Sequence, residues 1–397
     1  MPRIDPVSSR PRLRIAVVTP LFPSREQLNA GQAIYNTVLG LERWAEVRVF
    51  CPSSRYPKGL GPTRFLHVPK DLSYRPAGVD TEYFEYPVLP RISRPFNGYV
   101  CARRLTPRIR EWQPGVILAY WLYPEGFAAV LAGRRLGVPV VVGSRGSDLR
   151  RIGDRATAYF TRRTVREASA VLAVSEDLRQ HALRMGAPAD RVKTVLNGCD
   201  GDIFRPSDRD AARTELGIAP EARLVLYVGR LDGGKGLEEL LGAAERLRDV
   251  EDLLVVCLGE GLLAGALRKR AADAGLGERV RFPGVGSRHE VARWMAASSL
   301  VCLPSESEGC PNVVCEALAC GRPVVSTTVG GIPDLVNRLC GILVPAADTE
   351  RLAQALREAL DVPWNSQTIA AQFTRTWNDV AADTFEICNG VLGLQNS

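Results

Sequence analysis

Short runs of β-branched and aliphatic residues alternate with helix-like segments along most of the chain, and this alternation constrains the fold more than any other feature. The strands expected in the first half are residues 14–20, 47–51, 116–120, 138–143, 170–174 and 191–195. The helices expected between them are residues 32–43, 125–136 and 155–167, and one that Ser175 opens. Strands that alternate with helices pair in parallel through right-handed crossovers, so an α/β fold is predicted.

The same alternation starts again after a polar turn. Asn197-Gly198 marks a turn, and residues 205–210 are polar and contain a proline. The strands expected beyond it are residues 224–229, 253–258, 279–282, 299–304, 323–327 and 341–345. The chain has 397 residues, more than one hydrophobic core usually supports.

Two Rossmann-like domains facing an interdomain cleft are therefore expected. The predicted limits are residues 1–198 for the first domain and 199–366 for the second. Residues 367–397 are expected to form a C-terminal helix that packs back on the first domain. The stretch 52–115 is rich in Pro, Arg and Tyr, and it predicts no regular element before residue 116. Pro107 is expected to interrupt any long helix in that stretch.

The segment from Pro304 to Pro323 is the most informative part of the sequence. A strand ends at its start, and Pro311 suits the first turn of a following helix. This places Glu308 in the loop at the carboxyl end of the strand and Glu316 in the helix. The exposed N–H groups of such a helix start suit a phosphate, and a nearby carboxylate can accept hydrogen bonds from sugar or ribose hydroxyls. A plain strand–loop–helix unit with surface acids is the alternative.

The residues of this segment resemble those of the retaining family 4 glycosyltransferases, which have the GT-B fold. The resemblance rests on the spacing of Glu308 and Glu316, the Glu-Gly-Cys-Pro-Asn loop, and the Gly-Arg-Pro-Val-Val run. Residues 228–236, 197–200 and 330–336 are similar to the family's phosphate-binding segment, interdomain turn and last site loop. The match is strong over residues 195–350 and looser over 12–195.

The resemblance implies a role for each matching position. Arg230 and Lys235 would hold the donor's pyrophosphate, and two cations after a strand can neutralise a diphosphate leaving group. Glu308 would contact the transferred sugar, and Glu316 the ribose hydroxyls. Other residues implied at the donor site are Gly31, Gly229, Gly284, Val285, Gly309, Cys310, Pro311, Asn312 and Val313.

The chain departs from the family at Arg145, where many members have a histidine. Arginine stays protonated and cannot act as a general base. We expect Arg145 to stabilise charge on the phosphate, to bind an anionic sugar or acceptor, or to be anchored structurally to Asp148. We assign Asp148 to the acceptor side. In the first domain, Gly31 follows Ala30 where many relatives have paired glycines.

Charge is unevenly distributed along the chain. Residues 1–200 hold 31 Lys and Arg against 17 Asp and Glu, a net +14, while the remaining residues carry a net −7. A cationic surface attracts anionic lipid or anionic substrates. Residues 91–112 and 145–166 combine arginines with aromatic residues, so they are candidates for contact with an anionic membrane, or for a solvated helix face over core aromatics.

The sequence thus predicts a cytoplasmic glycosyltransferase that uses a nucleotide sugar, UDP- or GDP-linked, and a polysaccharide or lipid-linked glycan acceptor. No cofactor and no metal is expected, because the ten cysteines and three histidines show no metal-ligand spacing. No nucleic-acid recognition motif is present. There is no apolar run long enough to span a bilayer, and no secretory signal is expected. The alternatives are a non-catalytic nucleotide-sugar or polyanion binding protein and a nucleotide-sugar epimerase on the same fold.

Overall fold

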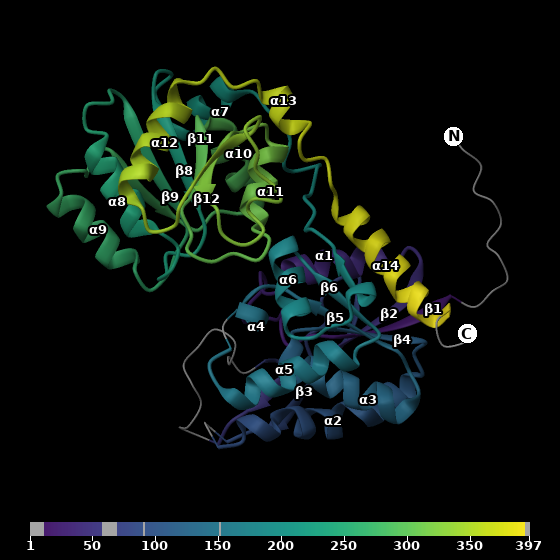
Figure 1. Ribbon diagram of the computed structural model, residues 1–397. Coiled ribbons are helices and arrows are strands. Elements are labelled where there is room, and N and C mark those ends of the chain that lie inside the picture. Colours follow the sequence, from purple (N-terminus) through teal and green to yellow (C-terminus); the bar gives the residue numbers. More distant parts are fainter. Residues whose placement is uncertain (1–11, 58–69, 90–91, 151, 394–397) are drawn as a thin grey trace, which may run out of the picture. The chain divides into compact units, whose positions relative to one another are not determined.

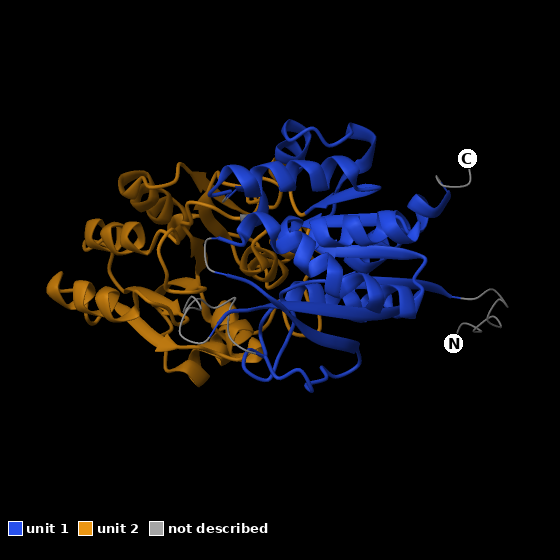
Figure 2. Cartoon of the chain, turned by 90° about the horizontal axis from the view of Figure 1, so that it is seen from below, with its two compact units in different colours: residues 1–173, 179–195, 378–397 blue, residues 174–178, 196–377 orange. Residues whose placement is uncertain are grey.

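The computed structural model describes residues 12–57, 70–89, 92–150 and 152–393, and its chain divides into two compact units (Figures 1 and 2). The first unit comprises residues 1–173, 179–195 and 378–397, and the second comprises residues 174–178 and 196–377. The chain thus passes from one unit to the other at Val195, and residues 367–377 cluster with the second unit.

The first unit is built on a parallel sheet of seven strands in the order β3-β2-β1-β4-β5-β6-β7. The strands are β1 (Leu13–Val18), β2 (Ala45–Arg55), β3 (Asp80–Pro87), β4 (Val116–Tyr120), β5 (Val140–Ser144), β6 (Ala170–Ala173) and β7 (Val192–Thr194). Its helices are α1 (Gln32–Leu41), η2 (Arg94–Phe96), α2 (Asn97–Trp112), η3 (Leu122–Gly126), α3 (Phe127–Leu136), α4 (Ser147–Arg150), α5 (Arg155–Glu167) and η4 (Ala189–Arg191). Helix α6 (Glu176–Arg184) begins in the segment that clusters with the second unit. Every residue of β4, β5 and β6 is buried, which explains their continuous apolar sequences.

The expectation that residues 52–115 lack regular structure is wrong. Strand β3 pairs in parallel with β2 over eight residues, and α2 continues through Pro107. A proline inside a helix costs about 3 kcal/mol because one hydrogen bond is lost. Cys101, Leu105 and Ile109 are completely buried on one face of α2, and this burial outweighs the loss.

The C-terminal region forms two helices, whereas the sequence suggested one C-terminal helix within residues 367–397. These are α13 (Ser366–Ala370) and α14 (Trp377–Gly393). Between them Thr376 bridges Cys199, and a Cβ on Gly198 would lie 2.3 Å from the Thr376 carbonyl oxygen. Residues 378–393 of α14 belong to the first unit, where Phe385 stacks on Trp44 with ring centroids 6.0 Å apart.

The second unit is built on a parallel sheet of six strands in the order β10-β9-β8-β11-β12-β13. The strands are β8 (Arg223–Val228), β9 (Leu253–Leu258), β10 (Val280–Gly284), β11 (Leu300–Leu303), β12 (Val324–Thr327) and β13 (Gly341–Val344). Its helices, besides α13, are α7 (Arg209–Leu216), α8 (Leu237–Arg246), α9 (Ala264–Asp273), α10 (Arg288–Ala297), α11 (Asn312–Ala319) and α12 (Thr349–Asp361). All ten cysteines of the chain are buried and free.

The strand order reverses direction once in each sheet, between β1 and β4 in the first unit and between β8 and β11 in the second. At such a switch point the loops at the carboxyl ends of the two neighbouring strands diverge to opposite faces of the sheet. The crevice between these loops is the usual ligand site of an open parallel sheet. The fold therefore points to the loops after β1 and β4, and to those after β8 and β11.

The loop after β8 approaches the end of β11 so closely that only glycine fits at position 236. Gly236 precedes α8 with φ of 68°, and a Cβ there would lie 1.9 Å from the Pro304 carbonyl oxygen. Left-handed backbone is accessible to glycine without a steric cost. Gly236 is therefore needed both for its conformation and for the close contact.

We predict that Gly236→Ala lowers the free energy of unfolding by about 2–5 kcal/mol, because it adds a collision to the strain of a left-handed alanine. Gly275→Ala is the matched control, since Gly275 has φ of 67° in the same unit and open space around its Cβ position. The control should lose only about 1–2 kcal/mol. Urea unfolding of both variants measures the difference, and equal losses would contradict the steric argument.

Candidate active site

The two loops at the switch point of the second sheet bring Lys235 and Glu308 together. Lys235 Nζ donates a hydrogen bond of 2.7 Å to Glu308 Oε1, and both side chains are largely buried. Lys235 follows β8 and Glu308 follows β11, so the pair lies where the strand order predicts a ligand. The Glu306 N–H also donates to the Gly234 carbonyl at 3.1 Å, which fixes the two loops to each other.

Arg230 lies on the same loop but faces a different partner. Its Nη1 is 2.8 Å from Asp232 Oδ2, and its side chain is 64% exposed. The Tyr227 hydroxyl donates to the Arg230 carbonyl at 2.8 Å, so the backbone of this residue is fixed while its guanidinium reaches toward solvent. Asp232 also accepts a hydrogen bond from the Leu262 N–H at 2.9 Å. Sequence reasoning did not single out Asp232.

The loop from Gly309 to Val313 leads into α11 and is held at both ends. The Gly331 N–H donates to the Gly309 carbonyl at 2.8 Å. The Asn197 amide donates to the Cys310 carbonyl at 2.8 Å and to Asn312 Oδ1 at 2.7 Å. Pro311 precedes the helix in extended conformation, and no side chain caps the helix start. The first N–H groups of α11 are therefore available to a ligand.

Glu316 lies within α11 and is mostly enclosed. Burial raises the pKa of the Glu316 carboxyl to about 7, while the charge of Arg288 acts in the opposite direction. Arg288 itself lies 3.1 Å from Asp200. A carboxylate held in a poorly solvated place is ready to accept hydrogen bonds from hydroxyl groups that replace the lost water.

Gly284 and Val285 lie at the end of β10, away from the switch point by two strands. Gly284 has φ of 92°, and its carbonyl accepts a hydrogen bond of 2.7 Å from the Gly259 N–H. Val285 is 69% exposed. Gly259 in turn packs on Gly229, since a Cβ there would lie 1.9 Å from the Gly229 carbonyl oxygen. These contacts join the loops after β8, β9 and β10 into one edge.

In the first unit, Gly31 lies at the start of α1 close to the loop after β1. It has φ of 64°, and a Cβ there would lie 2.3 Å from the Leu21 carbonyl oxygen. Among the described residues no side chain caps α1, which leaves its first N–H groups open to a ligand. The preceding Ala30 is buried and does not obstruct them.

Asp148 organises the loop that carries Arg145. Its Oδ1 accepts hydrogen bonds from Ser144 Oγ at 3.0 Å, the Arg145 N–H at 3.1 Å and the Gly146 N–H at 2.9 Å. The guanidinium of Arg145 lies 5.8 Å from the centroid of the Tyr120 ring. The hydrogen bond from Arg145 to Asp148 thus uses the Arg145 backbone N–H, while its guanidinium lies near the ring at the end of β4.

A buried carboxyl that the sequence analysis missed lies at the switch point of the first sheet. Glu125 follows β4, and burial raises its pKa to about 7. The Tyr86 hydroxyl lies 3.3 Å from Glu125 Oε1 and accepts a hydrogen bond of 3.1 Å from Ser54 Oγ. The signal was present, because Glu125 stands five residues after a buried strand, but its place in an expected helix masked it.

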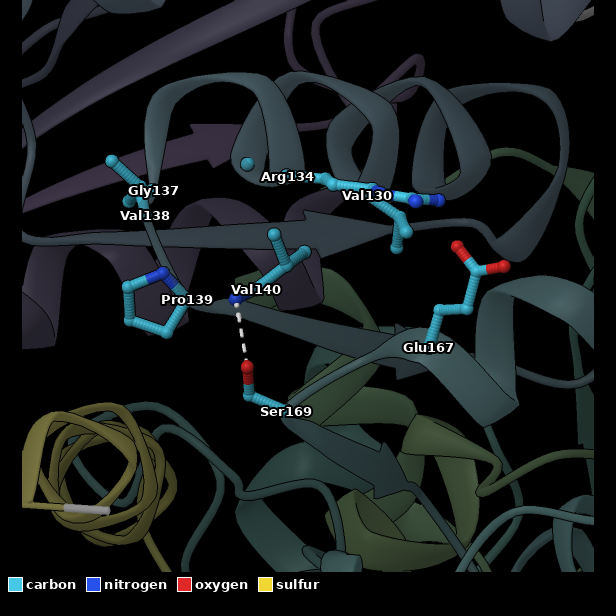
Figure 3. Close-up of a pocket in the computed structure, with 9 residues that line it drawn as sticks. Val130, Arg134, Gly137, Val138, Pro139, Val140, Glu167 and Ser169 are labelled. Atoms are coloured by element: carbon cyan, nitrogen blue, oxygen red, sulfur yellow. Dashed lines mark hydrogen bonds between the residues drawn. The ribbon is translucent and has the colours of Figure 1, made fainter. Parts of the chain in front are cut away.

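Other features of the described residues offer no metal site and no membrane-spanning helix besides these loops. No three His, Cys, Asp or Glu side chains gather there as a metal site. Within the same residues, no helix has the length and apolar character that crossing a membrane requires. A pocket of about 450 Å³ lies between the end of α3, the start of β5 and the end of α5 (Figure 3). It opens at the amino ends of the strands, where Arg134 and Glu167 are its charged side chains.

We predict that Glu316→Gln raises the free energy of unfolding at pH 8 by about 1–3 kcal/mol. The pKa of this carboxyl rises from 4.5 to about 7 on folding. Its stabilising contribution is therefore complete below the unfolded pKa and is lost as the pH rises to 7. At pH 5 the variant and the parent should differ by less than about 1 kcal/mol.

Glu290→Gln is the control for this measurement, because hydrogen bonds from Ser287 lower the pKa of Glu290. The control should destabilise the chain at pH 8 rather than stabilise it. Thermal unfolding at the two pH values tests both signs, and a Glu316→Gln protein less stable than the parent at pH 8 would refute the assignment.

Two family models match the chain, one in each half of the sequence. The model described as glycosyl transferases group 1 matches residues 208–377. The model described as glycosyl transferase 4-like domain matches residues 30–198.

Curated relatives agree with these matches. A D-inositol 3-phosphate glycosyltransferase from Frankia alni is 35% identical over 280 residues, which cover 64% of this chain and 68% of the relative. TuaC from Bacillus subtilis, named as a glycosyltransferase of teichuronic acid biosynthesis, is 30% identical over 363 residues, which cover 87% of this chain and 88% of the relative.

A solved structure shows the same fold. HepE from Anabaena, crystallised in complex with UDP, superimposes with a TM-score of 0.72 at 18% identity, over 97% of this chain and 100% of HepE. The two parallel sheets, the matched family models and the named relatives lead to one conclusion. This chain belongs to family 4 of the glycosyltransferases and has the GT-B fold.

Proposed function

We propose that this glycosyltransferase takes a sugar from a nucleotide sugar and transfers it, with retention of configuration, to a polysaccharide or lipid-linked glycan. The observation that carries the proposal is the Lys235–Glu308 pair at the switch point of the second sheet. A cation for a leaving phosphate and a carboxylate for sugar hydroxyls stand side by side there, next to the uncapped start of α11.

In this proposal the second unit holds the donor. Lys235 exchanges its ion pair with Glu308 for the donor's diphosphate, and the exposed Arg230 turns from Asp232 to the same group. Glu308 then accepts hydrogen bonds from the sugar, and Glu316 from the ribose. The edge formed by Gly229, Gly284 and Val285 holds the base. The complex of HepE with UDP supports a uridine nucleotide, and a guanosine nucleotide is the alternative.

The chemistry follows from where the charges lie. The leaving diphosphate gains negative charge as the glycosidic bond breaks, and Lys235, Arg230 and the start of α11 stabilise it without a metal ion. The acceptor hydroxyl attacks from the same face, and the departing diphosphate takes its proton. Glu308 orients the sugar by accepting hydrogen bonds from its hydroxyls, and it forms no covalent bond with it.

On the acceptor side, Arg145 takes the position of the family's usual histidine. A guanidinium stays charged, so it stabilises anionic oxygen and does not remove a proton. Asp148 holds the Arg145 backbone in place, as its hydrogen bonds to the loop indicate. The substitution also favours a second candidate, a protein that binds nucleotide sugars without turnover. Release of nucleoside diphosphate in the presence of acceptor separates the two, and an epimerase would need no acceptor.

We predict that Lys235→Ala weakens binding of the cognate nucleotide sugar by about 10–100-fold, because a charge-assisted hydrogen bond to phosphate is lost. Thermal-shift titration against UDP-, GDP-, ADP- and dTDP-sugars identifies the cognate donor and measures the loss. Lys269→Ala serves as the control, since Lys269 is exposed on α9 and pairs only with Asp273 one turn away. If both variants bind the donor like the parent, the proposed donor site is wrong.

We also propose that the first unit contacts an anionic membrane on the cytoplasmic side. Phe96, Tyr99 and Tyr159 are 62%, 44% and 60% exposed, although large aromatic side chains are usually buried. Tyr99 and Tyr159 both pack on Phe160, with centroid distances of 5.8 and 5.1 Å, so they lie on one surface.

Arginines surround these aromatic residues. Arg103 follows Tyr99 by four positions on α2, and Arg162 follows Tyr159 by three on α5, so each lies on the same helix face as its tyrosine. Both arginines are exposed. Arg91 and Arg151 of the segments singled out in the sequence lie outside the described residues. Exposed aromatics rimmed by arginine match the interface of an anionic bilayer.

We predict that changing both Phe96 and Tyr159 to serine lowers binding to vesicles rich in anionic phospholipid by at least about tenfold, while donor binding is unchanged. Leu262→Ser is the control, because Leu262 is a 95% exposed apolar residue in the second unit. Vesicle co-sedimentation at two salt concentrations measures the effect. Equal binding by the double variant and the control would exclude this surface.

A further inference from the structure

The second unit contains a cavity at the amino ends of its strands that the proposed reaction does not use. The cavity has a volume of about 300 Å³, and its walls include the residues just before β8, β11 and β12. This volume is at the lower end of the range for small-molecule sites. The donor loops follow the carboxyl ends of the same strands, so the cavity lies at the opposite edge of the sheet, about 15–20 Å away by strand length.

Four arginines line this cavity: Arg209, Arg213, Arg223 and Arg322. Arg223 is paired with Asp361, and the other three, Arg209, Arg213 and Arg322, differ from it. Arg213 and Arg322 are only 3% and 8% exposed. Within the described part of the chain, none of the three forms an ion pair with a carboxylate. Buried guanidinium groups are normally paired, because removing a charge from water is costly unless an opposite charge compensates for it.

The hydrogen bonds of the three arginines differ. Arg213 is fully used, since it donates to the carbonyls of Ala297, Ala219, Pro220 and Ala222 and so shapes the wall. Arg209 donates to Ser299 Oγ at 2.9 Å, and Arg322 to the Ser298 carbonyl at 3.3 Å. The Nε–H groups of Arg209 and Arg322 are buried and have no acceptor. Two donors on charged groups are thus left without partners at the cavity.

The charges also act on one another. Burial, together with the positive charges of Arg209 and Arg213, lowers the pKa of Arg322 to about 10. The repulsion shows that the three guanidiniums share one electrostatic environment. An anion placed among them would relieve the repulsion.

We propose that this cavity is a second ligand site of the chain, one that binds a phosphate group of a small metabolite. The phosphate oxygens accept hydrogen bonds from Arg209 and Arg322, and the field of Arg213 adds to the attraction. Trp364 also lines the cavity, with its Nε1–H bonded to the Ala359 carbonyl at 2.8 Å. Its ring offers a flat surface for the sugar or base attached to the phosphate.

The site joins the sheet to the segment that leads toward α14. Arg322 follows Gly321, and a Cβ on Gly321 would lie 2.1 Å from Ser366 Oγ, at the start of α13. Val362, Pro363 and Trp364 of the same segment also line the cavity. A bound phosphate therefore fixes this segment against the sheet edge, and its binding stabilises the second unit.

Calorimetric titration tests the proposal in the full chain carrying Lys235→Ala, which weakens phosphate binding at the donor loops. The probes are inorganic phosphate, inorganic pyrophosphate and glucose 1-phosphate, with sodium chloride at matched ionic strength as the reference. We expect at least one probe to bind, and the glucose 1-phosphate arm separates an organic ligand from a free phosphate. Adding Arg209→Gln or Arg322→Gln should weaken binding at least about tenfold.

Glu221→Gln provides a variant that should change the affinity in the opposite direction. Glu221 is an exposed carboxylate on the cavity wall, and its removal should tighten binding about threefold. This variant keeps the test valid if Arg322→Gln does not fold. The proposal is overturned if no probe binds at millimolar concentration, or if binding is the same in the Arg209→Gln and Glu221→Gln proteins. Failure of the donor proposal would leave this result unaffected, since the part of the binding that Arg209→Gln or Arg322→Gln removes belongs to the cavity and not to the donor loops.

Discussion

The close contact between the Gly236 backbone and the end of β11 is the constraint on which the proposed donor site depends. It allows the loop after β8 to reach the loop after β11, and so brings Lys235 within 2.7 Å of Glu308. Any side chain at position 236 would push the two loops apart, because its Cβ would lie 1.9 Å from the Pro304 carbonyl oxygen. The site is thus produced by backbone packing first and by charge second. The same holds in the first unit, where Gly31 lets the start of α1 approach Leu21.

The regular alternation of strand-like and helix-like segments predicted both sheets. It missed elements whose formation depends on burial against distant residues and not on the local sequence pattern. Strand β3 begins Asp-Thr-Glu, which is too polar to be read as a buried strand, yet it pairs with β2 at the edge of the sheet. Helix α2 contains a proline and four arginines, and only its buried face explains its continuity. Local sequence cannot report that face, because the side chains that cover it come from α3 and from the sheet.

Some residues of the candidate site could be predicted from the sequence, and others could not. Lys235, Glu308 and the loop before α11 could be placed from sequence because each directly follows a strand, and parallel strands bring such loops to one edge. Glu125 could not be placed, because its role depends on enclosure by Tyr86 and Ser54 from two other strands. The arginine cavity is even harder to predict from the sequence. Its residues Arg209, Arg213 and Arg322 are spread over more than a hundred positions of the sequence. Arg322 also belongs to the Gly-Arg-Pro-Val-Val run, which the sequence analysis used only as part of the family resemblance.

The positive side chains at the two ends of the strands in the second sheet differ in whether a carboxylate pairs with them. At the carboxyl edge, Lys235 is paired with Glu308 and Arg230 with Asp232, so each cation has a carboxylate that a ligand must displace. Such pairing keeps the loops ordered when they are empty and lowers the affinity for any anion that cannot also satisfy the carboxylates. At the amino edge, the guanidiniums of Arg209 and Arg322 have no carboxylate to displace. The cavity at the amino ends of the strands therefore selects less among ligands of different shape. It binds a small phosphate whenever that phosphate is present at sufficient concentration. A selective donor loop and a permissive cavity on one sheet are what a transferase would need if its donor domain also responded to the supply of phosphorylated metabolites.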